Sequence, residues 1–139
     1  MVLTLDNIAS SFLFLKKKNF IETNGSYSSK DFGNALIIMR GDSFSLRFER
    51  DRGQIMIDIG GNQIGWFKLE YALEFIDRSI NQEDFGEPPS VPRLADLLQK
   101  HWLSMEELLG NKNKIDELKE FTSLKTETLI KKIFRNSTS

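Results

Sequence analysis

The chain has 139 residues, 40% of them hydrophobic and 28% charged, and eleven are phenylalanine. These values are typical of one folded domain around one apolar core, so we expect a single domain over residues 1–139 and exclude a disordered chain. The formal net charge of −1 argues against a surface built throughout for nucleic acid. Cysteine is absent, which excludes disulfides and thiolate chemistry. With no secretory or membrane-spanning pattern, we expect a cytoplasmic protein and no membrane partner.

The N-terminal segment has apolar residues at helical spacing, which predicts a helix over about residues 4–18. Lys16, Lys17 and Lys18 stand where cations suit the C-terminal end of a helix. The same lysines could contact phosphate, although a solvated helix end explains them without a partner. A short strand is expected over residues 19–23, followed by a polar loop over 24–33.

Three β-type runs fill residues 34–60, separated by Gly41-Asp42 and by a turn over 50–53. A two-residue turn at Gly41-Asp42 would pair Met39 with Phe44, Ile37 with Leu46 and Ala35 with Phe48. A four-residue second loop would pair Phe48 with Ile55, Leu46 with Ile57 and Phe44 with Ile59. Both registers place the same apolar residues on one face, which predicts an antiparallel meander.

The opposite sheet face is mixed, because it carries Leu36, Ile38, Ser45, Arg47, Met56 and Asp58. Gly60-Gly61-Asn62 allows another turn into a fourth run that ends near Phe67. The predicted sheet is therefore a meander of three to five strands.

Helical periodicity begins at Leu69 and continues to Ile80. A loop over residues 81–92 precedes a helix capped by Ser90 that runs through Trp102. The spacing of Ser104 and Glu107 resembles a capping box, so a new helical turn is expected at Ser104, with its end at Gly110. The remainder, to about residue 135, predicts one or two helices. Strands followed by helices indicate an α+β fold: an N-terminal helix, the meander, then three to four C-terminal helices.

Groups that carry catalysis are scarce. The lone histidine, His101, has no thiol to activate, and a helical surface position explains it as well. Asp58 and Glu49 could form a carboxylate pair, but the sequence shows no cleft between them. Glu83, Asp84 and Glu87 lack the spacing of a calcium loop. We therefore predict a protein that is not an enzyme and has no cofactor and no metal site.

A family resemblance supplies a more specific expectation. Residues 32–38, 44–54 and 66–70 form a pattern that resembles small bacterial immunity proteins of toxin systems, including contact-dependent inhibition loci. The resemblance covers about residues 30–77. It implies a cytoplasmic protein that binds one cognate toxin domain, often a nuclease, and neutralises it by covering its site.

A binder of a basic nuclease would use acidic side chains to speed encounter and buried aromatic anchors for affinity. We expect Trp66 to be the anchor. The expected acidic contacts are Glu70, Glu74, Asp77, Glu83, Asp84 and Glu87. Each carboxylate could equally be an ordinary solvated charge, and Trp66 an ordinary core residue.

Two other functions remain open on the sequence. The C-terminal helix is basic through Lys125, Lys131, Lys132 and Arg135, so a nucleic-acid-binding or regulatory domain is the first alternative. A small enzyme with carboxylate chemistry is the second.

Overall fold

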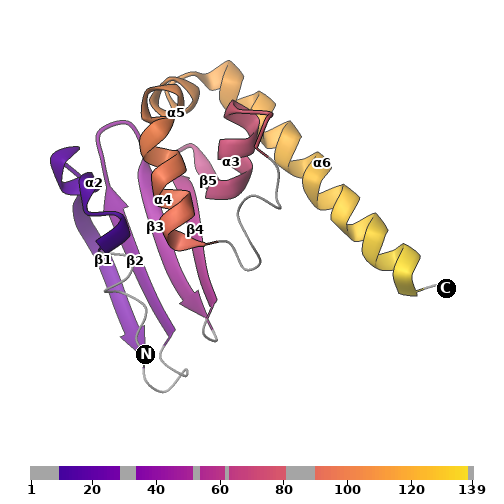
Figure 1. The fold of residues 1–139 in the computed structure, drawn as a ribbon, viewed down its shortest axis with the longest axis horizontal. Coiled ribbons are helices and arrows are strands. Elements are labelled where there is room, and N and C mark those ends of the chain that lie inside the picture. The colour runs from indigo at the N-terminus through magenta and orange to yellow at the C-terminus, as the bar shows by residue number, and fades with distance from the viewer. Residues whose placement is uncertain (1–9, 29–33, 52–53, 62, 81–89, 138–139) are drawn as a thin grey trace.

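The computed structural model describes residues 10–28, 34–51, 54–61, 63–80 and 90–137, with only the backbone described for residues 23–28, 34–35, 51, 54 and 132–137. Five antiparallel strands form one sheet in chain order (Figure 1). They are β1 (Ile21–Ser28), β2 (Asn34–Arg40), β3 (Ser45–Asp51), β4 (Gln54–Gly61) and β5 (Gly65–Lys68). The helices are α2 (Phe14–Lys17), α3 (Leu69–Ile76), α4 (Val91–Lys100), α5 (Trp102–Leu109) and α6 (Lys112–Ser137). The predicted α+β class is confirmed.

The N-terminal helix is shorter than predicted within the described residues. A turn at residues 12–13 precedes α2, so an unbroken helix to residue 18 is wrong, and residues 4–9 lie outside the described part. The turn accompanies the packing of Phe12, whose ring meets Phe48 of the sheet edge-on at 5.0 Å. After α2 the chain turns at Asn19, whose φ is 64°.

The first strand is longer than predicted. β1 continues to Ser28, so the expected loop over residues 24–33 is wrong for residues 24–28. Pairing with β2 supplies backbone partners from Arg40 back to Asn34. These ladder bonds override the weak strand propensity of a segment rich in Gly, Ser and Asn. The register shifts between Glu22 and Asn24.

Both predicted hairpin registers are wrong by two residues. The structure pairs Arg40 with Ser45, which leaves residues 41–44 as a four-residue loop. The loop is closed by a hydrogen bond from the Gly41 N–H to the Phe44 carbonyl at 3.0 Å. Phe44 turns into the core instead of extending the ladder. In the second hairpin Asp51 pairs with Gln54.

The two-residue shifts preserve which face each side chain occupies, because the side-chain period of a strand is two. Met39 pairs with Leu46, Ile37 with Phe48, Leu46 with Ile59 and Phe48 with Ile57. Leu46, Phe48, Ile57 and Ile59 are all buried, as the sequence pattern predicts. The predicted fourth run is confirmed as β5.

Two helix boundaries differ from prediction. α3 ends at Ile76 instead of Ile80, because Asp77 has an extended backbone and its side chain accepts the Ser79 N–H at 3.0 Å. α4 ends at Lys100, and α5 begins at Trp102, so Ser104 lies inside α5 and its predicted role as a helix start is wrong.

Ser90 does cap α4, since its Oγ accepts the Arg93 N–H at 3.4 Å. The predicted end at Gly110 is also confirmed.

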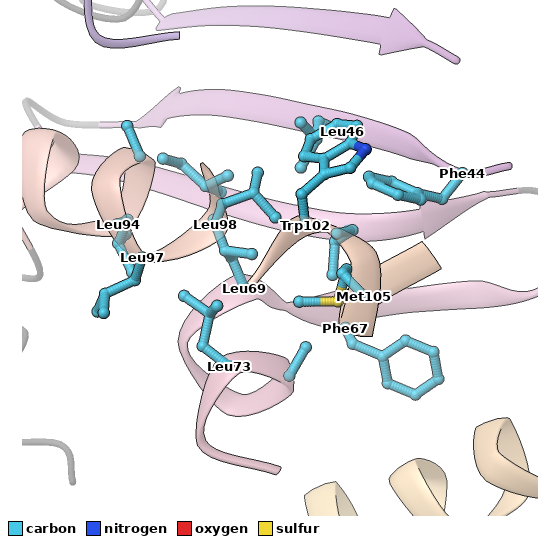
Figure 2. Close-up of a cluster of buried hydrophobic side chains, with 14 of the residues drawn as sticks. Phe44, Leu46, Phe67, Leu69, Leu73, Leu94, Leu97, Leu98, Trp102 and Met105 are labelled. Carbon is cyan, nitrogen blue, oxygen red and sulfur yellow. The ribbon is translucent and has the colours of Figure 1, made fainter. Parts of the chain in front are cut away.

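The core lies between the sheet and the helices. Figure 1 shows α2, α4 and α5 on one face of the sheet, and Figure 2 shows side chains of α4 and α5 directed toward those of the strands. The break at His101 turns the chain so that Trp102 and Met105 join Leu98 against the strands. The helices thus cover one face of the sheet.

Candidate protein-binding surface

The face of the sheet opposite the helices, here called the outer face, is organised in cross-strand rows. One row runs from Ile38 through Arg47 and Asp58 to Lys68. A neighbouring row places Gly60 beside Trp66, and the row on the other side places Glu49 beside Met56. Ile38 and Trp66 are half-buried, and Met56 is 39% exposed. Apolar side chains therefore remain partly accessible on a surface that also carries charges of both signs.

Arg47 occupies the centre of the outer face. Its Nε and Nη2 both donate to Oδ2 of Asp58, at 3.1 and 2.7 Å. Its guanidinium also lies over the Trp66 ring, 4.6 Å from the ring centre. A carboxylate and an aromatic face thus hold one arginine from two sides, which limits the side-chain freedom of all three residues. A surface fixed in this way loses little conformational entropy when a partner binds.

Trp66 separates two open hollows. On one side, Trp66 and Lys68 of β5, with Tyr71 of α3, face Thr126 and Ile130 of α6 across a hollow of about 550 Å³. On the other side, the loops that follow β2 and β4 enclose a hollow of about 570 Å³. The second hollow is polar and contains Arg40, Asp42 and Gln63 in addition to Trp66. A partner that filled both hollows would desolvate Trp66, as aromatic anchors at interfaces are desolvated.

Gly60 holds the position of Trp66. Its φ is 146°, and a Cβ at this position would lie 1.8 Å from the Gly65 carbonyl oxygen. Only glycine accepts both conditions, so the backbone of β4 can approach the start of β5 closely. The sequence pattern showed these glycines only as turn residues.

Glu70 is the one predicted acidic contact in the described part of the chain that makes neither an ion pair nor a side-chain hydrogen bond with another residue. It lies in the first turn of α3 and is half-buried. Burial raises the pKa of its carboxyl. The hydrogen bond from its own backbone N–H and the positive charge of Lys68 lower this pKa, and the negative charge of Asp58 raises it. The Glu70 carboxylate therefore lies close enough to Asp58 of the outer face for the two negative charges to repel, and burial disfavours its charged form as well.

Glu74 and Asp77 are used within the fold. Oε1 of Glu74 accepts from Nζ of Lys125 at 2.5 Å, while its Oε2 is buried without a hydrogen-bond partner. Asp77 accepts hydrogen bonds from the Ser79 hydroxyl and backbone N–H, and both bonds lower the pKa of its carboxyl. Burial raises this pKa, whereas the charges of His101 and Lys100 lower it. His101 Nε2 lies 3.5 Å from Asp77 Oδ2. The predicted acids Glu70, Glu74 and Asp77 therefore do not form one exposed acidic surface.

The other predicted acidic contacts, Glu83, Asp84 and Glu87, lie outside the described residues. The suggested carboxylate pair is not formed as such, because Asp58 is bound to Arg47 and Glu49 stands opposite Met56. Of the basic residues on α6, Lys125 is paired with Glu74 and Lys131 is exposed.

Sequence reasoning missed the role of Arg47 and of the hollows beside Trp66. A signal for Arg47 was present, because the predicted register already places Arg47 and Asp58 on the same sheet face, diagonal to each other, and the true register places them directly opposite. The hollow next to α6 had none, because it joins residues about 60 positions apart in the chain.

Within the described ranges, no three His, Asp or Glu side chains converge in a geometry that could hold a metal ion. None of the helices that the structure describes combines the length and apolar character needed to cross a membrane.

Comparison of the chain with protein-family models, with curated proteins and with solved structures yields no match.

Proposed function

We propose that this protein is a non-catalytic binding module that attaches to a protein partner through the outer face of its sheet, centred on Trp66. The supporting observation is the Asp58–Arg47–Trp66 stack between two open hollows. Tryptophan and arginine are the residues most enriched among those that dominate binding energy at protein interfaces. The ladder fixes both of them before any partner arrives, so binding needs little rearrangement.

Glu70 extends this surface and gives it a preferred partner chemistry. Its carboxylate has lost part of its hydration without gaining an ion pair. A partner lysine or arginine placed there would form an ion pair with the carboxylate and would offset the cost of its desolvation. This fits the immunity-protein function that the sequence resemblance implies, in which a cytoplasmic protein covers a basic toxin domain.

The test is protection of growing cells. The reading frames next to the gene for this chain are expressed one by one, and any toxic product is co-expressed with the wild-type chain or with a variant. We expect the wild type to restore growth and Trp66→Ala to abolish the protection. Leu103→Ala is the matched control, because Leu103 is 79% exposed on α5, away from the sheet.

The same variants are compared in vitro with the purified toxic domain. Loss of Trp66 should weaken binding at least about thirtyfold, since a central aromatic anchor contributes roughly 2–4 kcal/mol. Neighbouring genes without toxic products, or full protection by Trp66→Ala, would contradict the proposal.

A further inference from the structure

A second surface lies between α3 and α6, apart from the outer face. A hollow of about 450 Å³ opens there, lined by Tyr71, Arg78, Phe121, Leu124, Lys125 and Leu129. Of these residues only Tyr71 also lines the hollow beside Trp66. We call it the α3–α6 groove.

The groove arises because α6 leaves the body of the protein. Leu118 is fully buried, whereas farther along the same helix Leu124 is 57% and Leu129 51% exposed. Figure 1 shows the C-terminal half of α6 projecting away from the sheet. Two large apolar side chains thus stand at the rim of a hollow whose floor is aromatic.

The floor is rigid. Phe121 of α6 meets Phe75 of α3 edge-on, with 5.4 Å between ring centres. The guanidinium of Arg78 lies 4.6 Å from the centre of the Phe121 ring and 5.1 Å from that of Phe75. Its Nε donates to the Phe75 carbonyl at 3.2 Å. Arg78 is therefore fixed at the rim by aromatic and backbone contacts.

The rim has an excess of positive charge. Arg78 makes no ion pair with any carboxylate in the described residues. The adjacent Asp77 is directed to Ser79 and His101. Glu74 is 13% exposed and bound to Lys125, so it cannot neutralise Arg78 as well. Exposed Lys131 follows on α6.

Shape and charge together indicate the occupant. A groove between two helices, with leucines on its rim, fits the apolar face of a third amphipathic helix. Carboxylates flanking that face would meet Arg78, which has no carboxylate partner among the described residues. A second copy of this chain would bring the same cations against each other, which is unfavourable. We propose that the α3–α6 groove binds an acidic amphipathic helix of a partner protein.

This inference is independent of the outer face, so Trp66 variants leave it unchanged. The probe is a synthetic peptide of roughly 18 residues, long enough to be helical, with leucines on one face and glutamates on its flanks. A second peptide has lysine in place of every glutamate. Binding to the full chain is measured by fluorescence anisotropy at low and at high salt.

We expect the glutamate peptide to bind, less tightly at high salt, and the lysine peptide to bind at least about tenfold more weakly. Arg78→Glu and Leu129→Ser should each weaken binding at least about fivefold. Leu129 is half-exposed, so its substitution tests the groove without loss of a core contact. Arg93→Glu and Leu103→Ser are matched controls on exposed positions of α4 and α5, and should stay within about twofold of wild type.

Several outcomes would overturn the proposal. These are no binding of the glutamate peptide, equal binding of the lysine peptide, or equal losses in the controls. A dimer that Leu129→Ser dissociates would assign the groove to a second copy. Tight binding of an RNA duplex that Arg78→Glu removes would assign it to nucleic acid.

Discussion

At the residue scale, Glu70 shows how the burial of a single carboxylate links stability to pH. Its pKa is raised above 4.5, chiefly by burial, so the folded chain holds its proton more tightly than the unfolded chain does. The protonated form therefore favours folding. This contribution is complete below pH 4.5 and is lost as the pH rises through the folded pKa.

Glu70→Gln should consequently raise the free energy of unfolding at neutral pH, because the amide removes a desolvated charge and keeps the shape. The gain should shrink as the pH falls through the folded pKa and should be gone below pH 4.5, where wild-type Glu70 is also neutral. Urea denaturation of both proteins at neutral pH and below pH 4.5 measures this difference in the free energy of unfolding. A variant that is less stable than wild type at neutral pH would mean that the carboxylate stabilises the N-terminus of α3 by more than its burial costs.

Gly60 is a second residue with a local structural role, because the absence of a side chain lets the backbone of β4 approach Gly65. We expect Gly60→Ala to cost at least about 2 kcal/mol, because it adds both an unfavourable φ and an overlap with the Gly65 carbonyl. Gly61→Ala is the matched control, since its φ is 156° but nothing lies within 4 Å of the added Cβ. Equal losses of stability, measured by urea denaturation, would show that the overlap is relieved by a backbone shift.

At the element scale, the sequence predicts what local periodicity determines. The strand faces, the Ser90 cap and the end of α5 follow from alternation and from capping residues. The register of the β2–β3 hairpin could not be predicted in this way, because Phe44 leaves the ladder to meet Phe20 and Trp102, with ring centres 5.6 and 5.1 Å away. Those contacts join residues that are distant in sequence. The pairing of Glu74 with Lys125, 51 residues away, escaped prediction for the same reason.

The long helix α6 should differ in stability along its length. Amide protons near Leu118, which is fully buried, should exchange slowly, whereas those after Lys125 should exchange much faster, because a helix without packing is marginally stable in water. Hydrogen exchange followed by mass spectrometry measures this gradient. Uniformly slow exchange would contradict the prediction and would indicate that the C-terminal half is covered in solution.

At the scale of the whole molecule, Trp102 joins three segments that are far apart in the chain. Its ring contacts Phe14 of α2, Phe20 before β1 and Phe44 in the loop between β2 and β3. The Nζ of Lys18 lies over the same ring at 5.1 Å. The N-terminal helix, one end of the sheet and the α4–α5 corner thus depend on one side chain.

Trp102→Ala should therefore lower the free energy of unfolding by about 3–5 kcal/mol. Leu103→Ala, at the neighbouring exposed position, should change it by less than about 0.5 kcal/mol. Denaturation followed by circular dichroism compares the two variants with wild type. A small loss in Trp102→Ala would mean that the segments are held together by other contacts.

The order of the strands has a further consequence, for how fast the sheet can assemble. Every strand pairs only with the strand before or after it in the chain. No pairing in the sheet has to wait for a distant segment to arrive, so the entropy lost on closing each loop is small. Proteins with mostly local contacts fold quickly for this reason. A chain that must be ready as soon as its partner appears would benefit from a sheet that can form one hairpin at a time.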